Sequence, residues 1–308
     1  MFSTSGGAVD FSHRRRTIIT FAVVGAVIAT VLGVIALVRS PAPPSKSLGY
    51  SKQSALPLSG LNNPTSVAVD DKGDIYVADA GNRRVLKLTP GSTSQTQLPF
   101  TGLQHLTALA VDNKGDVYAA YFTDGFPAVG KVVKLALGSN SQTTVPFTDL
   151  VDPRALAVDP TGDVYVADRR TQQVVEMPAG SNRQTVLPFQ GLELPQGVAV
   201  DTDGDVYVTD TQMYGNRVVK LTPGSNDPIT LPFTGVDQPY GVAVGNDGSV
   251  YITDPNKRQV VELPAGSDSQ TALPFRGLNT PEGVAVDASG NVYVADAKRA
   301  RVVKLVAG

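Results

Sequence analysis

The chain has 308 residues, 42% of them hydrophobic, and a formal net charge of −2. It has no cysteine, and its two histidines, His13 and His105, stand far apart. This composition allows a large folded core. It excludes disulfides, cysteine nucleophiles, a multi-histidine metal centre and a global attraction to nucleic acid. We therefore expect no metal, no cofactor and no nucleic-acid partner.

An apolar segment lies near the N-terminus. Residues 17–38 carry no charge, and positions 14–16 are three arginines. A segment of this length crosses a ~30 Å hydrocarbon layer as a helix, with the positive charge kept inside. We expect an uncleaved membrane anchor. The alternative is a cleaved signal peptide, whose apolar region is usually shorter, about 7–15 residues, and ends at a small-residue cleavage site.

The anchor divides the chain into four parts. We expect a short cytoplasmic tail at 1–16, a transmembrane helix at 17–38, a proline-rich linker at 39–50 and one domain outside the membrane at 51–308. Small residues recur every fourth position within the anchor, so it could also pair with a second helix.

The domain is built from repeats. The stretch GDVYVAD at 162–168 has relatives at 73–79, 115–121, 204–210, 248–254 and 290–296. Each unit contains four short runs rich in Val, Ile, Tyr and Thr, punctuated by Gly, Asp and Pro, which predicts four strands, named a to d here. The D-x-x-G-D spelling between runs a and b predicts a tight turn, with Gly supplying positive φ and Asp binding the turn backbone.

The two ends of the domain complement each other. The last unit supplies only strands a to c, from residues 281–306, whereas residues 52–58 form a fourth strand with no unit before it. Four-stranded units at this period bury both faces when they stack into a ring. We therefore expect an all-β, six-bladed β-propeller with four antiparallel strands in each blade, closed by the N-terminal strand.

These repeats resemble the NHL family of β-propellers. The resemblance rests on PQGVAVD at 195–201, GDVYVTD at 204–210 and a basic turn into RVV at 217–219, and it covers residues 51–308. The QT-x-LPF spelling of strand d, behind a single membrane helix, resembles the extracytoplasmic sensor domain of mycobacterial receptor serine/threonine kinases of the PknD type. That resemblance implies a sensor; the kinase motifs are absent from this sequence.

Departures from the repeat mark the candidate sites. The residues just before each strand a should surround one channel mouth and are the ligand-binding candidates. They are Thr65, Thr107, Arg154, Gln196, Tyr240 and Glu282. The longer b–c loops of blades 2 and 4, with a neighbouring arginine pair, carry the protein-binding candidates. They are Tyr121, Phe122, Phe126, Arg169, Arg170, Met213 and Tyr214.

Two functions compete. The first is a membrane-anchored extracytoplasmic sensor that binds an unknown protein or small ligand and has no catalytic activity, working with a kinase in trans or lacking its kinase through a truncated start. The second is a propeller enzyme of the lyase or lactonase type. Because His105 stands without a second histidine or a repeated metal-binding residue, we expect no enzyme.

Overall fold

The computed structural model describes residues 49–213 and 215–308. The predicted cytoplasmic tail, the membrane helix, nearly all of the linker and Tyr214 lie outside the described residues. Within those ranges, no helix has both the length and the apolar character needed to cross a membrane.

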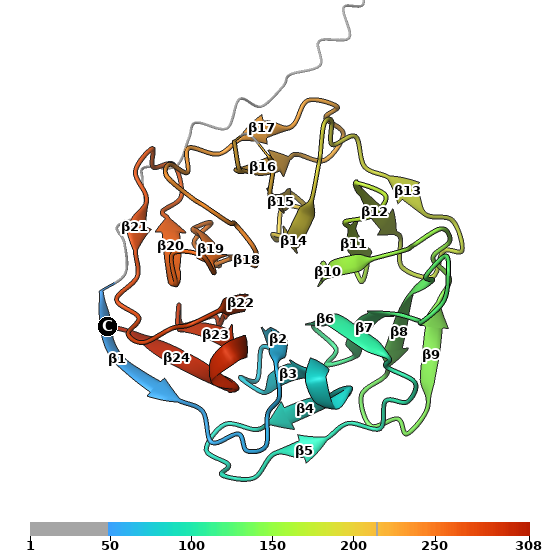
Figure 1. Cartoon of the computed structure of the whole chain (residues 1–308), viewed down its shortest axis with the longest axis horizontal. Coiled ribbons are helices and arrows are strands. Elements are labelled where there is room, and N and C mark those ends of the chain that lie inside the picture. Colours follow the sequence, from blue (N-terminus) through green and yellow to red (C-terminus); the bar gives the residue numbers. More distant parts are fainter. Residues whose placement is uncertain (1–48, 214) are drawn as a thin grey trace, which may run out of the picture. The chain divides into compact units, whose positions relative to one another are not determined.

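The described residues form six four-stranded antiparallel sheets, arranged radially around one axis (Figure 1). In each blade the first strand lies nearest the axis and the last lies at the rim. This confirms the predicted six-bladed, all-β propeller.

The strands of blades 1 to 3 follow the chain in order. Blade 1 comprises β2 (Pro64–Val69), β3 (Ile75–Asp79), β4 (Arg84–Leu88) and β5 (Thr96–Gln97), with the short 3-10 helix η1 (Ala80–Asn82) after β3. Blade 2 comprises β6 (His105–Val111), β7 (Val117–Phe122), β8 (Gly130–Leu135) and β9 (Gln142–Val145). Blade 3 comprises β10 (Pro153–Val158), β11 (Val164–Asp168), β12 (Gln173–Met177) and β13 (Thr185–Val186).

Blades 4 to 6 repeat the pattern. Blade 4 comprises β14 (Pro195–Val200), β15 (Val206–Asp210), β16 (Arg217–Leu221) and β17 (Ile229–Thr230). Blade 5 comprises β18 (Val242–Val244), β19 (Val250–Asp254), β20 (Gln259–Leu263) and β21 (Thr271–Ala272). Blade 6 comprises β22 (Pro281–Val286), β23 (Val292–Asp296), β24 (Arg301–Ala307) and, from the other end of the domain, β1 (Tyr50–Ala55), with η2 (Ala297–Arg299) after β23.

Ring closure depends on the pairing of β1 with β24. Lys52 lies opposite Val306 and Ala55 opposite Val303. The strand was expected at 52–58, but it begins at Tyr50 and ends before Pro57, because proline has no N–H to continue the ladder. Beyond the strand, Leu56 still donates its amide to the Val302 carbonyl at 2.9 Å.

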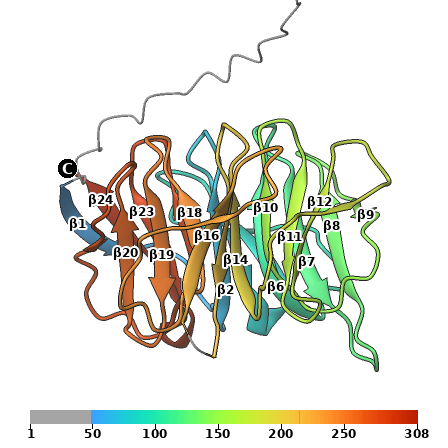
Figure 2. The ribbon, with the colours of Figure 1, turned by 90° about the horizontal axis from the view of Figure 1, so that it is seen from above.

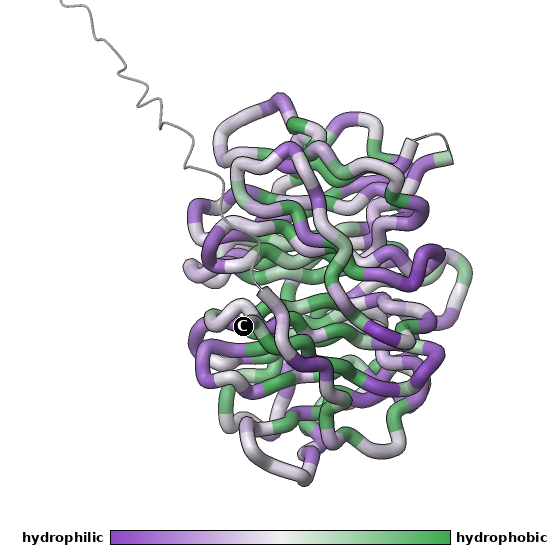
Figure 3. The backbone as a smooth tube through the Cα atoms, turned by 90° about the vertical axis from the view of Figure 1, so that its left-hand side faces the viewer, coloured by the Kyte–Doolittle hydropathy of each residue, from purple (hydrophilic) through white to green (hydrophobic). Residues whose placement is uncertain are grey.

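The core lies between the blades. Its buried side chains fall into six clusters, and each cluster joins two adjacent blades. Between blades 1 and 2, for example, Tyr76 and Val85 pack with Leu109 and Val117. Figure 3 shows the hydrophobic residues along the interior strands and the hydrophilic ones at the turns. No blade buries both of its faces without a neighbour on each side.

The a–b turns are fixed by their first aspartate. Asp70 Oδ1 accepts the amides of Lys72 and Asp74, and Asp70 Oδ2 accepts the hydroxyl of Tyr76 on β3. Gly73 has a φ of 81°, which a residue with a side chain rarely adopts. The tyrosine-to-aspartate bond recurs in blades 2, 3, 4 and 6.

A second aspartate, at the end of strand b, holds the opposite face. Asp79 is fully buried and accepts the amide of Asn62 and the guanidinium of Arg84. Equivalent carboxylates stand in blades 3 to 6. These carboxylates hold the backbone of the d–a loops, and in blades 1, 4 and 6 they also bind an arginine of strand c. In blade 2 the position is occupied by Tyr121.

Glutamine side chains clasp neighbouring blades. In blade 2, Gln142 donates to the Thr101 carbonyl and accepts the Thr101 amide, at 3.0 and 2.9 Å. The same two-bond clasp is made by Gln53, Gln95, Gln184 and Gln270. Blade 4 has Pro228 at this position, so the junction between blades 3 and 4 has no glutamine clasp.

Deleting residues 51–58 should destroy cooperative folding of the propeller. The deletion removes the β1–β24 ladder, the Gln53 clasp and the side chains of Leu56 and Leu58, which pack between blades 6 and 1. Each leucine contributes up to about 1.5–3 kcal/mol, a large share of a typical ~5–15 kcal/mol stability. The measurement is thermal melting by circular dichroism, with the full chain as control. An unchanged melting curve would show that the ring does not need this strand.

Candidate functional site

The propeller has two faces, which Figure 2 shows at the two ends of the strands. We call the face with the a–b and c–d turns the acid-turn face, and the one with the b–c turns and d–a loops the throat face. Both faces have a cavity near the axis.

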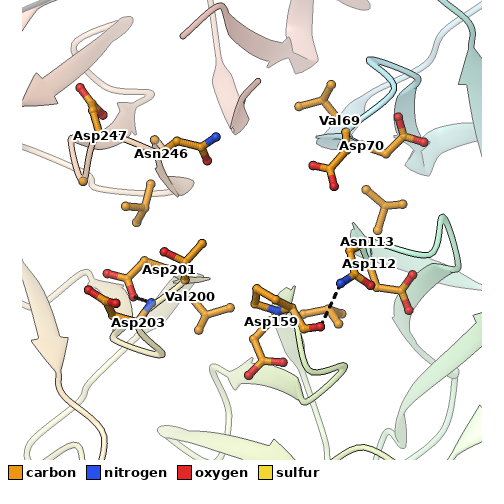
Figure 4. Close-up of a pocket in the computed structure, with 18 residues that line it drawn as sticks. Val69, Asp70, Asp112, Asn113, Asp159, Val200, Asp201, Asp203, Asn246 and Asp247 are labelled. Carbon is orange, nitrogen blue, oxygen red and sulfur yellow. Dashed lines mark hydrogen bonds between the residues drawn. The ribbon is translucent and has the colours of Figure 1, made fainter. Parts of the chain in front are cut away.

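The larger cavity, about 660 Å³, opens on the acid-turn face and is lined by the a–b turns of blades 1 to 5 (Figure 4). Its carboxylates include Asp70, Asp112, Asp159 and Asp201, and each of these accepts amides of its own turn. Among the residues that the structure describes, no cluster of three or more His, Asp or Glu side chains could hold a metal ion. These four aspartates therefore have a structural role in their own turns.

The smaller cavity, about 70 Å³, lies at the axis near the throat face, and we call it the throat. It is lined by residues from the first strand of every blade. All six ligand-binding candidates are among them: Thr65, Thr107, Arg154, Gln196, Tyr240 and Glu282. The structure therefore brings the six together as expected, and their binding role stays a prediction.

A β-bulge places these side chains at the throat. The register of strand a against strand b shifts between Pro64 and Ser66, and the extra residue is Thr65. The same shift falls at Thr107, Arg154 and Gln196, and at Glu282 together with Gly283. A bulge adds one unpaired residue and re-aims its side chain. In blade 5, Tyr240 instead precedes β18 and donates its amide to the Thr253 carbonyl.

Four buried side-chain atoms near the throat have no hydrogen-bond partner. They are Thr65 Oγ1, Asp152 Oδ1, Arg154 Nε and Gln196 Oε1, and they are the complete set of such atoms in the described part of the chain. Gln196 is only 6% exposed. Arg154 Nε lies 3.0 Å from Asp152 Oδ1, an ion pair that lacks hydrogen-bond geometry.

The charges around the throat are unbalanced. Asp152 is shared by Arg154 and by Arg169, whose Nη2 lies 2.7 Å from Asp152 Oδ2. Burial raises the pKa of the Glu282 carboxyl from 4.5 to about 7, although Arg154 and Lys298 oppose the rise. Burial also raises the pKa of the Tyr240 phenol to about 12, so this hydroxyl stays protonated.

The backbone of two throat residues is held from the neighbouring strand. Thr209 Oγ1 donates to the Tyr240 carbonyl at 2.5 Å, and Thr253 Oγ1 donates to the Glu282 carbonyl at 2.6 Å. A Cβ on Gly241 would collide with the Glu282 carbonyl oxygen. Glycine is required there because two first strands approach each other closely.

A second cavity, about 350 Å³, adjoins the throat, and we call it the mouth. The two cavities share Thr65, Thr107, Arg154 and Tyr240. The mouth is also lined by His105 and Phe122, whose rings stack with centroids 4.5 Å apart. His105 Nε2 lies 2.6 Å from Asp124 Oδ1 in the b–c loop of blade 2.

The pairing of His105 with Asp124 was not predicted from the sequence. His105 was set aside as a lone histidine, and Asp124 was not singled out. A signal was present, because blade 2 has Tyr121 in place of the structural aspartate and a longer b–c loop, YFTDGFPAVGK. The loop returns Asp124 toward the d–a loop, where its amide donates to Gln104.

The protein-binding candidates differ in how exposed they are. Tyr121 is 7% exposed and packs in the core between blades 1 and 2, so it is not the surface residue that was expected. Phe122 is half-buried at the mouth, whereas Phe126 and Met213 are exposed, in the loops of blades 2 and 4. Arg169 binds Asp152 and Arg170 is exposed. Their role as a binding surface stays a prediction.

The NHL repeat family matches residues 61–88, 150–176, 192–221 and 278–305, which cover the first three strands of blades 1, 3, 4 and 6. The chain contains NHL repeats. The two blades without a match are blade 2, which carries His105 and the long loop, and blade 5, with its short β18. No curated protein matches the chain at a significant level.

Many solved structures share the fold. A gluconolactonase from Xanthomonas campestris has 13% identity and a TM-score of 0.69, with 88% of this chain and 99% of that chain covered. A catalytically inactive virginiamycin B lyase from Staphylococcus aureus, solved with quinupristin, has 13% identity and a TM-score of 0.61, covering 83% and 99%. A nidogen/laminin complex contains a chain with 18% identity and a TM-score of 0.63, covering 72% and 85%.

These structures correct one expectation. We expected no enzyme, because His105 had no second histidine beside it. That exclusion is wrong, since a lyase and a gluconolactonase are built on the same propeller fold. At such low identity the likeness shows the fold alone.

Replacing Glu282 by glutamine should stabilise the propeller above neutral pH. The folded carboxyl holds its proton up to about pH 7, whereas the unfolded one releases it near 4.5. The stabilising contribution of the Glu282 carboxyl is therefore fully present below pH 4.5 and is lost as the pH rises to about 7. Glu282→Gln removes this loss, which is worth roughly 2–3 kcal/mol.

Urea unfolding at about pH 4 and about pH 8 measures this effect. The variant should exceed the wild type at the higher pH and equal it at the lower one. Asp203→Asn, on the exposed acid-turn face, is the matched control. An equal gain at both pH values would mean that the charge of Glu282 is not responsible.

Proposed function

We propose that this chain is a membrane-anchored, extracytoplasmic sensor module that binds a small ligand at the throat and mouth. The observation that carries the proposal is the group of partnerless polar atoms. Buried polar groups in folded proteins nearly always have a hydrogen-bond partner, and a few exceptions gathered at one place indicate a ligand or bound water. Here the Thr65 hydroxyl and the Gln196 amide oxygen are such atoms at one cavity, and Arg154 Nε beside them faces Asp152 without hydrogen-bond geometry.

The dimensions also favour a small ligand. The mouth, at about 350 Å³, is at the lower end of the ~300–1,000 Å³ range of ligand pockets. It combines the half-buried ring of Phe122 with the polar groups of Arg154 and Tyr240. Convergent polar groups of this kind fix the orientation of a ligand in its pocket.

The anchor and its orientation are part of the proposal. We propose that residues 17–38 cross the membrane with residues 1–16 in the cytoplasm. Tyr50 lies opposite Ala307, whose amide binds the side chain of Asn291 in an a–b turn. The chain thus enters β1 from the acid-turn face, which supports a throat turned away from the membrane.

The proposed signalling partner is a kinase or another protein. The resemblance to kinase sensor domains supports a kinase acting in trans, and pairing of two anchors would bring two propellers together. Phe126 and Met213, exposed on loops of the throat face, are the side chains that we propose for protein contact.

A second candidate function is acid–base catalysis on the bound ligand. The observation that favours it is the His105–Asp124 pair at the mouth, because a carboxylate at this distance orients an imidazole for proton transfer.

A ligand-capture experiment tests both functions. The full chain in a mild detergent is incubated with a small-molecule extract, separated by gel filtration and denatured, and the released compounds are identified by mass spectrometry. We expect wild type to retain a compound that Gln196→Leu loses, whereas Arg170→Leu, outside the cavities, retains it. Equal recovery from wild type and Gln196→Leu would contradict the site. Recovery of an altered compound from wild type, but of the intact one from His105→Ala, would favour catalysis.

Surface labelling tests the orientation. Because the natural chain has no cysteine, single cysteines can be introduced and labelled in intact cells. Arg170→Cys on the throat face should react faster with a membrane-impermeant maleimide than Asp203→Cys on the acid-turn face. Both positions are exposed. The reverse order would reject the proposed orientation.

A further inference from the structure

We propose that the throat binds the carboxylate group of a small organic acid through Arg154, and that Glu282 takes up a proton when the acid binds. This inference rests on the proposed ligand-binding function and names the chemical class of the ligand.

Size limits what can enter the throat. The throat, at about 70 Å³, is much smaller than the mouth and has room for a small polar group, not for a whole ligand. A carboxylate group has three heavy atoms. The rest of the ligand would lie in the 350 Å³ mouth, beside the ring of Phe122.

The polar groups of the throat favour an anion. Arg154 lines the throat, and although its Nε faces Asp152 Oδ1 at 3.0 Å, its guanidinium matches a carboxylate in shape and charge. The Thr65 hydroxyl and the Tyr240 phenol can also donate. Gln196 Oε1 is an acceptor that needs a donor, which a hydroxyl or amino group next to the carboxylate would supply. Among the lining residues, Arg154 is the one that always carries a charge, and Glu282 is the one that ionises near neutral pH.

The surrounding charge supports this assignment. Arg154 and Arg169 share the single carboxylate of Asp152, and Arg83 also lines the mouth. The carboxylates at the ends of the neighbouring strands β19 and β23 already have partners. Asp254 accepts the amides of residues 237 and 238, and Asp296 accepts those of 279 and 280.

Glu282 faces charges from several elements. Arg154 on β10 and Lys298 on η2 favour its ionised form, and Tyr240 ahead of β18 stays neutral. The lining residues of β2 are all uncharged. Burial outweighs the two cations and holds the pKa of Glu282 at about 7. An anion in the same cavity would raise this pKa further. A neutral Glu282 could then donate to the bound carboxylate.

The proposal fixes the sign of the pH dependence. Because binding takes up a proton, affinity for a carboxylate should fall up to tenfold for each pH unit above about 7. A cationic ligand would bind more tightly as Glu282 ionises, and a neutral ligand would show little dependence. The three ligand classes are therefore distinguishable.

The test uses calorimetric titration of the full chain in detergent. The probes are acetate, lactate and benzoate, with acetamide, lactamide and benzamide as uncharged matches and inorganic phosphate as a second anion. At about pH 6 we expect at least one carboxylate to bind with a dissociation constant in the millimolar range or below, and its amide at least tenfold more weakly. Between about pH 7 and pH 9 the affinity should fall by a factor of ten or more.

Substitutions test the roles of Arg154 and Glu282 one at a time. Arg154→Leu should abolish carboxylate binding, whereas Arg170→Leu should leave it unchanged. Glu282→Gln should keep binding and lose its pH dependence, because a neutral amide can donate at every pH. This variant is expected to be more stable than wild type, so it tests the proposal even where Arg154→Leu does not fold.

Several results would overturn the inference. They are no carboxylate binding, equal binding of an acid and its amide, tighter binding of phosphate than of every carboxylate, and an affinity that stays constant or rises with pH. Capture of a neutral or cationic compound that depends on Gln196 would overturn it as well, but would leave the proposed ligand-binding function standing.

Discussion

The structure depends on one constraint, which is that a four-stranded blade cannot bury its two faces alone. Every core cluster joins two blades, so no blade is complete until both neighbours are in place. The last of these joints requires residues from the two ends of the domain, β1 and β24. Antiparallel pairing of these two strands joins the ends of the domain and closes the ring. The stability of each interface between blades therefore depends on the whole ring.

The same ring concentrates side chains at its axis. Repeats place equivalent residues at equivalent positions, so a bulge on strand a brings six of them to one cavity. Structural groups can be equal in all blades, as the turn aspartates nearly are, but the throat residues all differ in chemistry except the two threonines. In this propeller the residues that hold each turn repeat from blade to blade, whereas the residues at the axis differ. Ligand recognition can therefore arise at the axis without loss of the fold.

The fold followed from the sequence, because period, turn chemistry and the unpaired fourth strand each have a direct structural cause. Residues such as Gly73 and Asp70 act within a few positions of themselves, so their roles are visible in the sequence. The six throat residues were also predictable, since equivalence between repeats fixes their place. What was not predictable depends on packing between blades. Tyr121 packs in the core between blades 1 and 2, and His105 contacts Asp124 of the long b–c loop. Burial raises the pKa of Glu282 in a cavity that is lined by all six blades.

The glutamine clasps have a mechanical consequence. Five junctions are tied by paired amide bonds at the rim, and the join between blades 3 and 4, where Pro228 stands, is not. Blade 3 carries Arg154 and blade 4 carries Gln196. At this junction Arg217 donates to the Gln190 carbonyl at 3.1 Å in place of the clasp, and any widening here would change the spacing between Arg154 and Gln196 at the axis. A ligand bound between Arg154 and Gln196 would therefore contact both sides of a junction that has no glutamine clasp.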